Sequence, residues 1–410
     1  MRRVAVTGIG VVSPLGNGTD EIFQAARAGS SAVRIVDHPF ADRAMRWPAA
    51  PSRFDGATHF DPAKLRALDR VSQFGIVAAR RALTDSNLDL TAIDRERIGV
   101  FVGTGMGSSQ TMDTGYRVLY GERSDRIMPL TVLMGMHNSA AAWIGQEMQL
   151  TGPNITYSTA CSSSSVAIGE AWLRLRRGEL DVAIAGGAEA PLSLGSLMAW
   201  HAMRTLARID EIDASASCKP FAKNRCGMVL GEGAAIIFLE AWEHALERGA
   251  AILGEVAGYG LATDIGHIAR PSVAGQAAAI QAALRSANMD PSTVDGINAH
   301  ATGTQANDAI ETAAIRSVFG VRANDIPISA TKAVHGHLLG AAGAFELVLS
   351  ILALRHQVAL PTMHLGIADP ECDLDYVPHV ARELSMRTML SNSFAFGGTN
   401  AVLALRATTP

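Results

Sequence analysis

The sequence predicts an α/β fold, because short apolar strand-like runs alternate with helix-like segments along all 410 residues. Hydrophobic residues make up 48% of the chain, enough to bury a large core at this length. Glycine or a charged residue bounds each apolar run, which fits strands buried on both faces. These observations exclude a disordered chain and leave room for two or three domains, or one large duplicated one.

The elements can be placed in order along the chain. Strands are expected at residues 4–8, 98–103, 182–186 and 234–239, and helices at residues 72–83, 165–176 and 240–248. The second helix has arginines in its last turn and a glycine directly after them, which complements the helix dipole. The least regular stretch, residues 104–135, is expected to line an entrance or an interface.

The second part of the chain begins a similar rhythm. Residues 255–260 resemble the opening strand, and helix, strand and glycine-rich segments follow. We therefore expect two related halves, 1–250 and 251–410, with no long polar linker between them.

Charge and composition limit the partners and the compartment. A formal charge of −4 argues against nucleic acid as the main partner. Four cysteines without a CxxC pair argue against a disulfide scaffold and a zinc knuckle. The longest apolar stretch, residues 338–354, contains Glu346 and is expected to be a core helix, not a membrane span. Glycines break the N-terminal apolar run, so no signal peptide is expected and the predicted compartment is the cytosol.

Cys161 gives the strongest local signal. It lies in residues 156–165, where an apolar approach meets small residues and a helix begins. A thiol at a helix N-terminus faces unpaired N–H groups and the positive end of the dipole, which can lower its pKa. The alternative is a buried core cysteine, the more common role of a free thiol.

Two histidines occupy similar settings. His300 and His337 lie in loops rich in Gly and Ala, each following a strand-like run, and sites in α/β sheets assemble there. One Cys and two His in such positions form a constellation for covalent acyl chemistry. The pair formed by His335 and His337 also fits a metal site, but its spacing supplies no clear third ligand.

Two glycine-rich segments allow further functions. Residues 103–107 and 8–10 contain parts of a dinucleotide loop, but neither completes GxGxxG. Residues 392–400 contain adjacent glycines, which can aim N–H groups at an oxyanion or simply form a tight turn.

The motifs around these three residues, at 159–162, 298–300 and 336–343, form a highly specific combination. With the glycine motifs at 4–10, 186–189, 229–234 and 396–400, the chain resembles the elongating β-ketoacyl-acyl carrier protein synthases of the thiolase superfamily over nearly its full length. The resemblance implies a thiolase fold, five-layered αβαβα, built from two similar halves. It also implies a homodimer, or a heterodimer with a homologous subunit.

The same resemblance implies a mechanism and its residues. Cys161 would carry the acyl chain, and His300 and His337 would assist decarboxylation of malonyl-acyl carrier protein and the condensation that follows. No cofactor is expected, because the phosphopantetheine arm arrives on the carrier. Further residues match family positions: Lys332 the lysine that tunes the site, Glu346 its ion partner, and Asp308 and Glu311 the acidic positions after the first histidine motif. Thr302 and Thr304 match the threonines that hydrogen-bond the phosphopantetheine arm. Phe394 and Phe396 match the gate, the Phe396 N–H matches the oxyanion hole, and Met106 matches a residue that limits chain length.

The carrier is acidic, so a local basic patch is expected as its docking site, and the candidates are Lys64, Arg66, Arg70 and Arg204. The chain departs from the family's usual residues at Ala395, Ala301, Gly303 and His335. The pathway therefore stays open, and both fatty-acid elongation and a specialised polyketide or polyene pathway fit. Two other functions stay open: a non-catalytic partner subunit resembling a chain-length factor, and a cysteine hydrolase.

Overall fold

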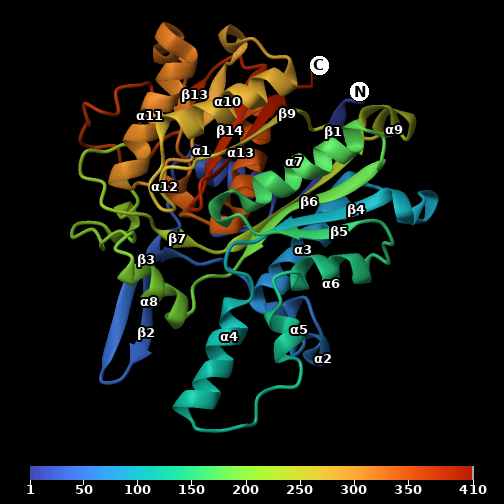
Figure 1. Ribbon diagram of the computed structural model, residues 1–410, viewed down its shortest axis with the longest axis vertical. Coiled ribbons are helices and arrows are strands. Elements are labelled where there is room, and N and C mark those ends of the chain that lie inside the picture. The colour runs from blue at the N-terminus through green and yellow to red at the C-terminus, as the bar shows by residue number, and fades with distance from the viewer. Residues whose placement is uncertain (409–410) are drawn as a thin grey trace.

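The computed structural model describes residues 1–408, and its strands repeat one arrangement in the two halves of the chain (Figure 1). The first half has the order β5-β4-β6-β8-β1 and the second the order β11-β10-β14-β15-β9. When the five strands of each half are numbered in chain order, both halves have the order 3-2-4-5-1. The strands of the first half are β1 (Val4–Val12), β4 (Ile98–Gly103), β5 (Asn154–Tyr157), β6 (Val182–Glu189) and β8 (Gly233–Ala241). Those of the second half are β9 (Gly254–Thr263), β10 (Gly296–Asn298), β11 (Ile328–Ser329), β14 (Thr388–Phe394) and β15 (Thr399–Arg406).

Strand directions repeat as well. In each half two neighbouring pairs are parallel and two are antiparallel, in the same sequence across the sheet. A short antiparallel pairing of β1 with β9 joins the half-sheets into one ten-stranded sheet among the described residues. The duplication predicted from the glycine rhythm is thus confirmed by the topology.

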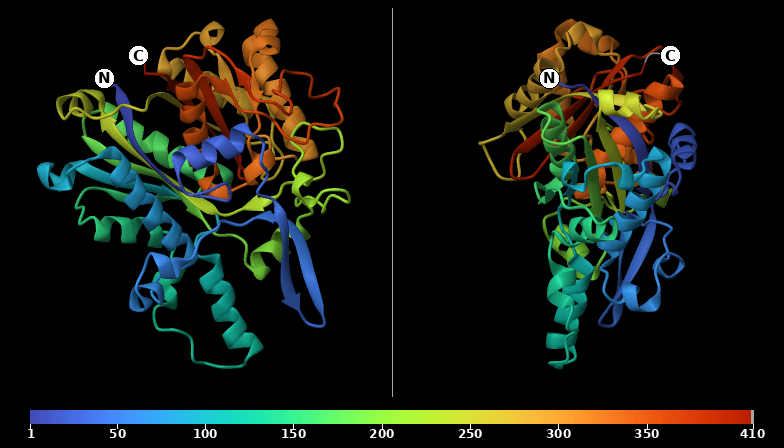
Figure 2. Two further views of the ribbon diagram at one scale, coloured as in Figure 1. Left: turned by 180° about the vertical axis from the view of Figure 1, so that it is seen from behind. Right: turned by 90° about the vertical axis from the view of Figure 1, so that its right-hand side faces the viewer.

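Six helices complete the layers (Figures 1 and 2). They are α3 (Arg70–Ser86) and α6 (Ser139–Glu147) on one outer face, α7 (Ser163–Arg176) and α13 (Ala342–His356) in the middle, and α10 (Val273–Ala287) and α11 (Gln305–Phe319) on the other outer face. Helices cover both faces of the strands because successive side chains of a strand point to opposite faces of the sheet. In β6, Ile184 packs in the cluster of α3 and α6, and its neighbour Ala185 packs in the cluster of α7 and α13. The predicted five-layered αβαβα fold is confirmed.

Helix α13 is apolar around its whole circumference because it lies in the middle layer. The stretch Leu339–His356 is long and apolar enough to cross a membrane, but 89% of it is buried inside the protein. The prediction of a core helix here is therefore confirmed.

Several predicted boundaries were wrong. The strand expected at 182–186 runs to Glu189, and the helix expected at 72–83 spans Arg70–Ser86. The first strand does not end at Gly8 but runs through Gly10. The glycine at position 10 is explained by a close contact, since a Cβ there would lie 2.0 Å from the carbonyl oxygen of Ala78 in α3. Glycine here allows a helix to pack closely and does not break the strand. The helix predicted from residue 240 begins at Trp242, since Glu240 belongs to β8.

The other elements surround this frame. A hairpin of β2 (Arg34–Phe40) and β3 (Arg43–Ala50) lies beside α8 (Leu194–Ala202), and α4 (Ser109–Tyr116) and α5 (Thr131–Gly135) project from the body (Figure 1). Short elements are α1 (Thr19–Arg27), α2 (Pro62–Leu65), α9 (Trp242–Glu247), α12 (Lys332–His335), β7 (Leu230–Gly231), β12 (Val358–Ala359) and β13 (Arg382–Glu383).

Candidate active site

Cys161 lies in a 3₁₀ turn, Ala160–Ser162, between the end of β5 and the start of α7. Ala160 adopts a positive φ of 51°, a strained conformation for a residue with a Cβ, and this sharp turn delivers the thiol to the helix N-terminus. The hydroxyl of Ser163 donates to the carbonyl oxygen of Ala160 at 2.6 Å and holds the turn closed. The thiol is therefore presented at a strand end, as predicted.

His300 follows β10, and the carboxylate of Glu311 in α11 fixes its backbone. The N–H groups of His300 and Ala301 donate to the two carboxylate oxygens at 2.8 and 2.7 Å. The amide of Asn392 in β14 donates to the same carboxylate at 3.1 Å. A buried acid thus replaces a regular hydrogen-bond ladder where the strand ends.

His337 follows α12, and the segment around β7 holds its backbone. Its N–H donates to the carbonyl oxygen of Val229 at 2.6 Å, and its own carbonyl oxygen accepts from the N–H of Gly231 at 2.9 Å. Among the described residues both ring nitrogens are buried without a hydrogen-bond partner. The imidazole is therefore free to act on a bound substrate.

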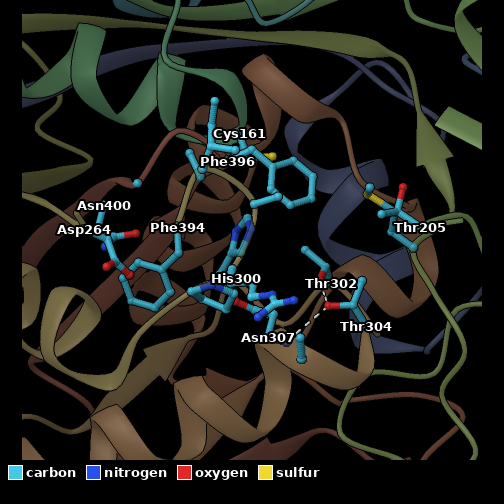
Figure 3. A pocket seen from close by; sticks show the side chains of 18 of the residues that line it. Cys161, Thr205, Asp264, His300, Thr302, Thr304, Asn307, Phe394, Phe396 and Asn400 are labelled. Atoms are coloured by element: carbon cyan, nitrogen blue, oxygen red, sulfur yellow. Dashed lines mark hydrogen bonds between the residues drawn. The ribbon is translucent and has the colours of Figure 1, made fainter. Parts of the chain in front are cut away.

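The three side chains converge on one pocket (Figure 3). The Cys161 sulfur and one ring nitrogen from each histidine lie within 4.8 Å of one another, and all three residues are buried. This brings together the residues predicted as the catalytic group. The atoms also form the candidate set for a thiophilic metal ion, although zinc bonds of about 2.0–2.3 Å require closer approach.

Burial controls the protonation of this group. It lowers the pKa of His300 and of His337 well below the usual value, and the nearby charge of Lys332 lowers them further. Burial also raises the pKa of Cys161 to about 12, although Lys332 and the N–H groups of Phe396 and Cys161 oppose the rise. Desolvation thus outweighs the lowering of this pKa that a helix N-terminus can provide. The site starts as a neutral thiol beside two neutral imidazoles.

Lys332 and Glu346 form a fully buried ion pair under the site. Burial raises the pKa of Glu346 to about 7. Breaking such a pair leaves an uncompensated charge, which costs about 3–5 kcal/mol. The charge of Lys332 lowers the pKa of all three groups, His300, His337 and Cys161.

Phe396 lies over the entrance to Cys161 on a loop after β14, and Phe394 packs 6.0 Å from the His300 ring (Figure 3). Gly397 and Gly398 follow at φ values of 84° and 80°, which favour glycine. The N–H of Gly397 donates to Ile268 O at 2.7 Å, and the N–H of Asp264 donates to Gly398 O at 2.8 Å. The gating loop is therefore tied to the loop before α10.

Thr302 and Thr304 line the outer part of the pocket, where they were predicted to meet the carrier arm. Their hydroxyls lie 3.0 Å apart, and Thr304 also caps α11. Asp308 does not reach the pocket. It lies behind it, where it accepts from the N–H of Phe221 at 2.8 Å, and burial raises its pKa to about 6. Its role is structural support.

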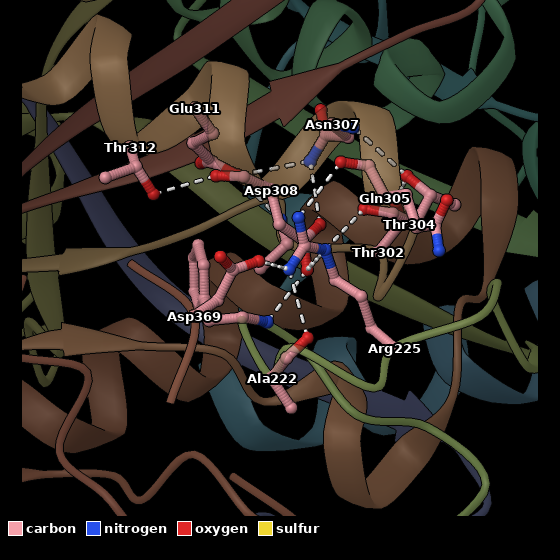
Figure 4. A network of polar contacts seen from close by, with 12 residues as sticks. Ala222, Arg225, Thr302, Thr304, Gln305, Asn307, Asp308, Glu311, Thr312 and Asp369 are labelled. Atoms are coloured by element: carbon pink, nitrogen blue, oxygen red, sulfur yellow. Dashed lines mark hydrogen bonds and ion pairs between the residues drawn. The ribbon is translucent and has the colours of Figure 1, made fainter. Parts of the chain in front are cut away.

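Arg225 explains why the threonine loop is held so firmly (Figure 4). It is buried, pairs with Asp369, and donates to the carbonyl oxygens of Thr304 and Gln305, each at 3.0 Å. Sequence reasoning missed this residue, because nothing in the order of residues relates position 225 to positions 304 and 369.

Glu189, at the end of β6, has a role that sequence reasoning also missed. Its carboxylate accepts from the N–H groups of Gly105, Met106 and Gly340, at 2.6, 3.0 and 2.9 Å. The glycine-rich loop considered for a dinucleotide is thus occupied by a buried acid, which excludes a phosphate there. The same bonds place Met106 in the apolar cluster that contains Cys161.

His335 does not join His337 in a metal site. Its Nε2 lies 3.1 Å from the hydroxyl of Thr331, and its ring packs edge-on against Phe345. Burial lowers its pKa to about 3, so it is a neutral core residue.

The four basic residues predicted for carrier docking differ in their surroundings. Arg70 makes two hydrogen bonds to the buried carboxylate of Glu232, at 2.6 and 3.0 Å. Lys64 lies over the ring of Trp143, 4.1 Å from its centroid. Arg66 and Arg204 are exposed and form no ion pair within residues 1–408. These last two are the freer cations.

The fold and the three converging side chains define a class, the thiolase-fold condensing enzymes, which are acyltransferases. Residues 1–245 match the N-terminal domain of β-ketoacyl synthases, and residues 253–366 match the C-terminal domain. The chain therefore belongs to the β-ketoacyl synthase family. The predicted division near residue 250 falls between the two matches.

Similar proteins span the full chain. A 3-oxoacyl-[acyl-carrier-protein] synthase 2 from Coxiella burnetii is 40% identical over 410 residues, covering 98% of both chains. Nodulation protein E from Rhizobium meliloti is 39% identical over 405 residues, covering 99% of both chains.

Two solved structures are similar throughout. The ishigamide ketosynthase/chain length factor has a TM-score of 0.92 at 33% identity and 100% coverage of both chains. The complex of a type II PKS acyl-carrier protein with its ketosynthase bound to the hexaketide has a TM-score of 0.91 at 31% identity, also with 100% coverage of both.

Proposed function

We propose that the protein is a β-ketoacyl-acyl carrier protein synthase. It extends an acyl chain, held as a thioester on Cys161, by two carbons taken from malonyl-acyl carrier protein. One observation carries this function: a thiol and two neutral imidazoles lie within 4.8 Å of one another at the bottom of a pocket. Membership of the β-ketoacyl synthase family agrees with it.

In the first half-reaction the Cys161 sulfur attacks the thioester carbonyl of the acyl carrier. Because the thiol is neutral, a neighbouring neutral imidazole must take its proton as the carbon–sulfur bond forms. The backbone N–H groups of Cys161 and Phe396 lie close enough to the sulfur to lower the pKa of the thiol, and in this proposal they donate to the carbonyl oxygen as it gains charge. The carrier thiol leaves with the proton, and the acyl chain stays on Cys161.

In the second half-reaction the malonyl thioester loses CO₂. The electron pair of the broken C–C bond moves onto the thioester as an enolate, and N–H donors of His300 and His337 stabilise its oxygen. The enolate carbon then attacks the acyl thioester on Cys161. A new C–C bond forms, the sulfur leaves as a thiolate and takes up one proton from solvent, and the β-ketoacyl product remains on the carrier.

The arm that presents both thioesters belongs to the carrier, so no resident cofactor or metal takes part in this proposal. Arg66 and Arg204 supply positive charge for an acidic carrier, and their charge reversal is expected to slow loading most strongly at low salt. The structure of a similar ketosynthase with its acyl-carrier protein is consistent with such a complex.

A homodimer in the cytosol is part of the proposal. Strand β5 is one of the two edge strands of the ten-stranded sheet, and edge strands can pair with other chains. The projecting segment beside it exposes apolar side chains, among them Tyr120, Met128, Val132 and Leu133. The similar ketosynthase/chain length factor structure makes a homologous partner the alternative. Light scattering of the purified chain distinguishes a dimer from a monomer that needs a partner subunit.

The test of function follows acylation and elongation separately. The wild-type chain alone is expected to gain one acyl mass from an acyl carrier and to convert malonyl carrier into a β-ketoacyl product. Cys161→Ala removes the mass gain. Failure of the wild type to do either, with fatty acyl and polyketide-type carriers, would support a non-catalytic subunit. Release of free acid without malonyl carrier would support a hydrolase.

A further inference from the structure

An apolar cluster extends beyond the pocket on the inner side of Cys161. Leu192, Leu197 and Leu339 are buried there, and the half-buried side chains of Met106, Met198, Trp200 and Phe396 pack against them. Cys161 and Phe396 belong both to this cluster and to the pocket lining, whereas Trp200 belongs to the cluster alone. Phe396 therefore separates the pocket from Trp200.

Trp200 and Phe396 form an offset stack. Their ring centroids lie 6.0 Å apart, and the ring planes are inclined by 28°. Trp200 sits on α8, which Ser193 caps at its start and which Trp47 fixes at its end through a hydrogen bond of 3.3 Å to His201. Phe396 sits on the loop that continues through two glycines with positive φ. When the stack opens, Phe396 is the ring that moves.

An acyl chain on Cys161 must leave the pocket free, because the malonyl arm enters there. The cluster is the apolar packing next to the sulfur, so a chain that enters it has to displace Phe396 from Trp200. The chain then lies against the uncovered indole face, with the polarisable sulfurs of Met106 and Met198 in the same cluster.

We infer that Trp200 makes this synthase select acyl chains that are flat and conjugated next to the thioester over saturated chains of equal length. The inference rests on the proposed function and names its substrate class. A planar π-system replaces the Phe396 ring on the indole, whereas a saturated chain meets the indole only through methylene groups. Stacking of this kind gains about 0.5–1.5 kcal/mol beyond area burial, which corresponds to a preference of about 2- to 13-fold.

The test compares two probes, the pantetheine thioesters of octanoic and 2,4-octadienoic acid. Initial rates of Cys161 acylation are read by intact mass. The ratio of the dienoyl to the octanoyl loading rate is expected to be about 2- to 13-fold higher in the wild type than in Trp200→Leu. In Trp200→Leu the ratio falls to the one set by the intrinsic reactivity of the two thioesters, and Trp200→Phe is expected to retain most of the wild-type ratio. Trp242→Leu, on the half-buried tryptophan of α9, is the matched control and leaves the ratio unchanged.

A second readout keeps the inference testable if Trp200→Leu does not fold. Loading of the dienoyl chain is expected to quench tryptophan fluorescence in the wild type, and to do so far less in Trp200→Phe. A ratio of the two loading rates that is the same in the wild type and in Trp200→Leu would overturn the inference alone. Absence of loading by either chain would overturn the proposed function, and the inference with it.

Discussion

The rings of His300 and His337 meet edge to face, with centroids 5.4 Å apart and planes inclined by 83°. Each ring comes from the segment that follows one of two parallel neighbouring strands, β10 and β11. Because such strands end at one edge of the sheet, two histidines far apart in sequence share one pocket with Cys161. Burial keeps both rings neutral, so each has one nitrogen to donate and one to accept.

Lys332 sets the acid limit of this pair. Its charge lowers the pKa of both histidines, so Lys332→Met is expected to raise both. Loading of Cys161 needs a neutral imidazole to accept the thiol proton. The acid limb of the loading rate should therefore move to higher pH in Lys332→Met, as measured by rapid quench and intact mass from pH 5 to 8.

Lys332→Arg keeps the charge and serves as the control, with an acid limb close to that of the wild type. An acid limb that stays in place in Lys332→Met would show that the lysine does not control these histidines.

His335 is expected to make the protein less stable in acid. Its folded pKa of about 3 lies below the usual value, because the buried ring is held neutral. The unfolded chain then binds more protons between these values, so the free energy of unfolding falls as pH falls below about 6.5. From pH 6.5 to 5 this one residue accounts for a loss of about 2 kcal/mol.

Urea unfolding at pH 7.5 and pH 5 checks this expectation in the wild type and in His335→Asn, which also lacks the titrating ring. The variant should lose less stability between the two pH values than the wild type does. An equal loss in both proteins would mean that the acid sensitivity arises elsewhere.

Ala395 is expected to slow the opening of the gate. A Cβ restricts backbone dihedrals that glycine leaves free, and Ala395 directly precedes Phe396. Ala395→Gly should speed acyl loading by roughly 2- to 5-fold, while lowering stability slightly. Single-turnover loading rates and thermal unfolding measure the two effects. A variant that loads at the wild-type rate would place the slow step elsewhere.

The sequence predicted the site better than its chemistry. Cys161, His300 and His337 were found because each lies in a short motif at a strand end, and strand ends meet. The protonation of Cys161 stayed open at the sequence level, because a motif shows the helix N-terminus but not the burial that raises the pKa of the thiol. Contacts between distant segments, such as Glu189 with Gly340, left no pattern in the order of residues.

The same limit applies to the fold. The duplicated layers followed from alternating apolar runs, which local sequence encodes. The true end of the first strand did not, because Gly10 is required by a helix more than sixty residues away in the chain.

The most direct measurement separates decarboxylation from condensation in Cys161→Ala. With malonyl-acyl carrier protein carrying a labelled carboxyl group, this variant is expected to release labelled CO₂, since His300 and His337 remain in place, but to gain no acyl mass and form no β-ketoacyl product. Adding His337→Ala should reduce the CO₂ release by about 100-fold or more. Acyl transfer or condensation that persists in Cys161→Ala would contradict the account, because the acyl chain would then have another carrier.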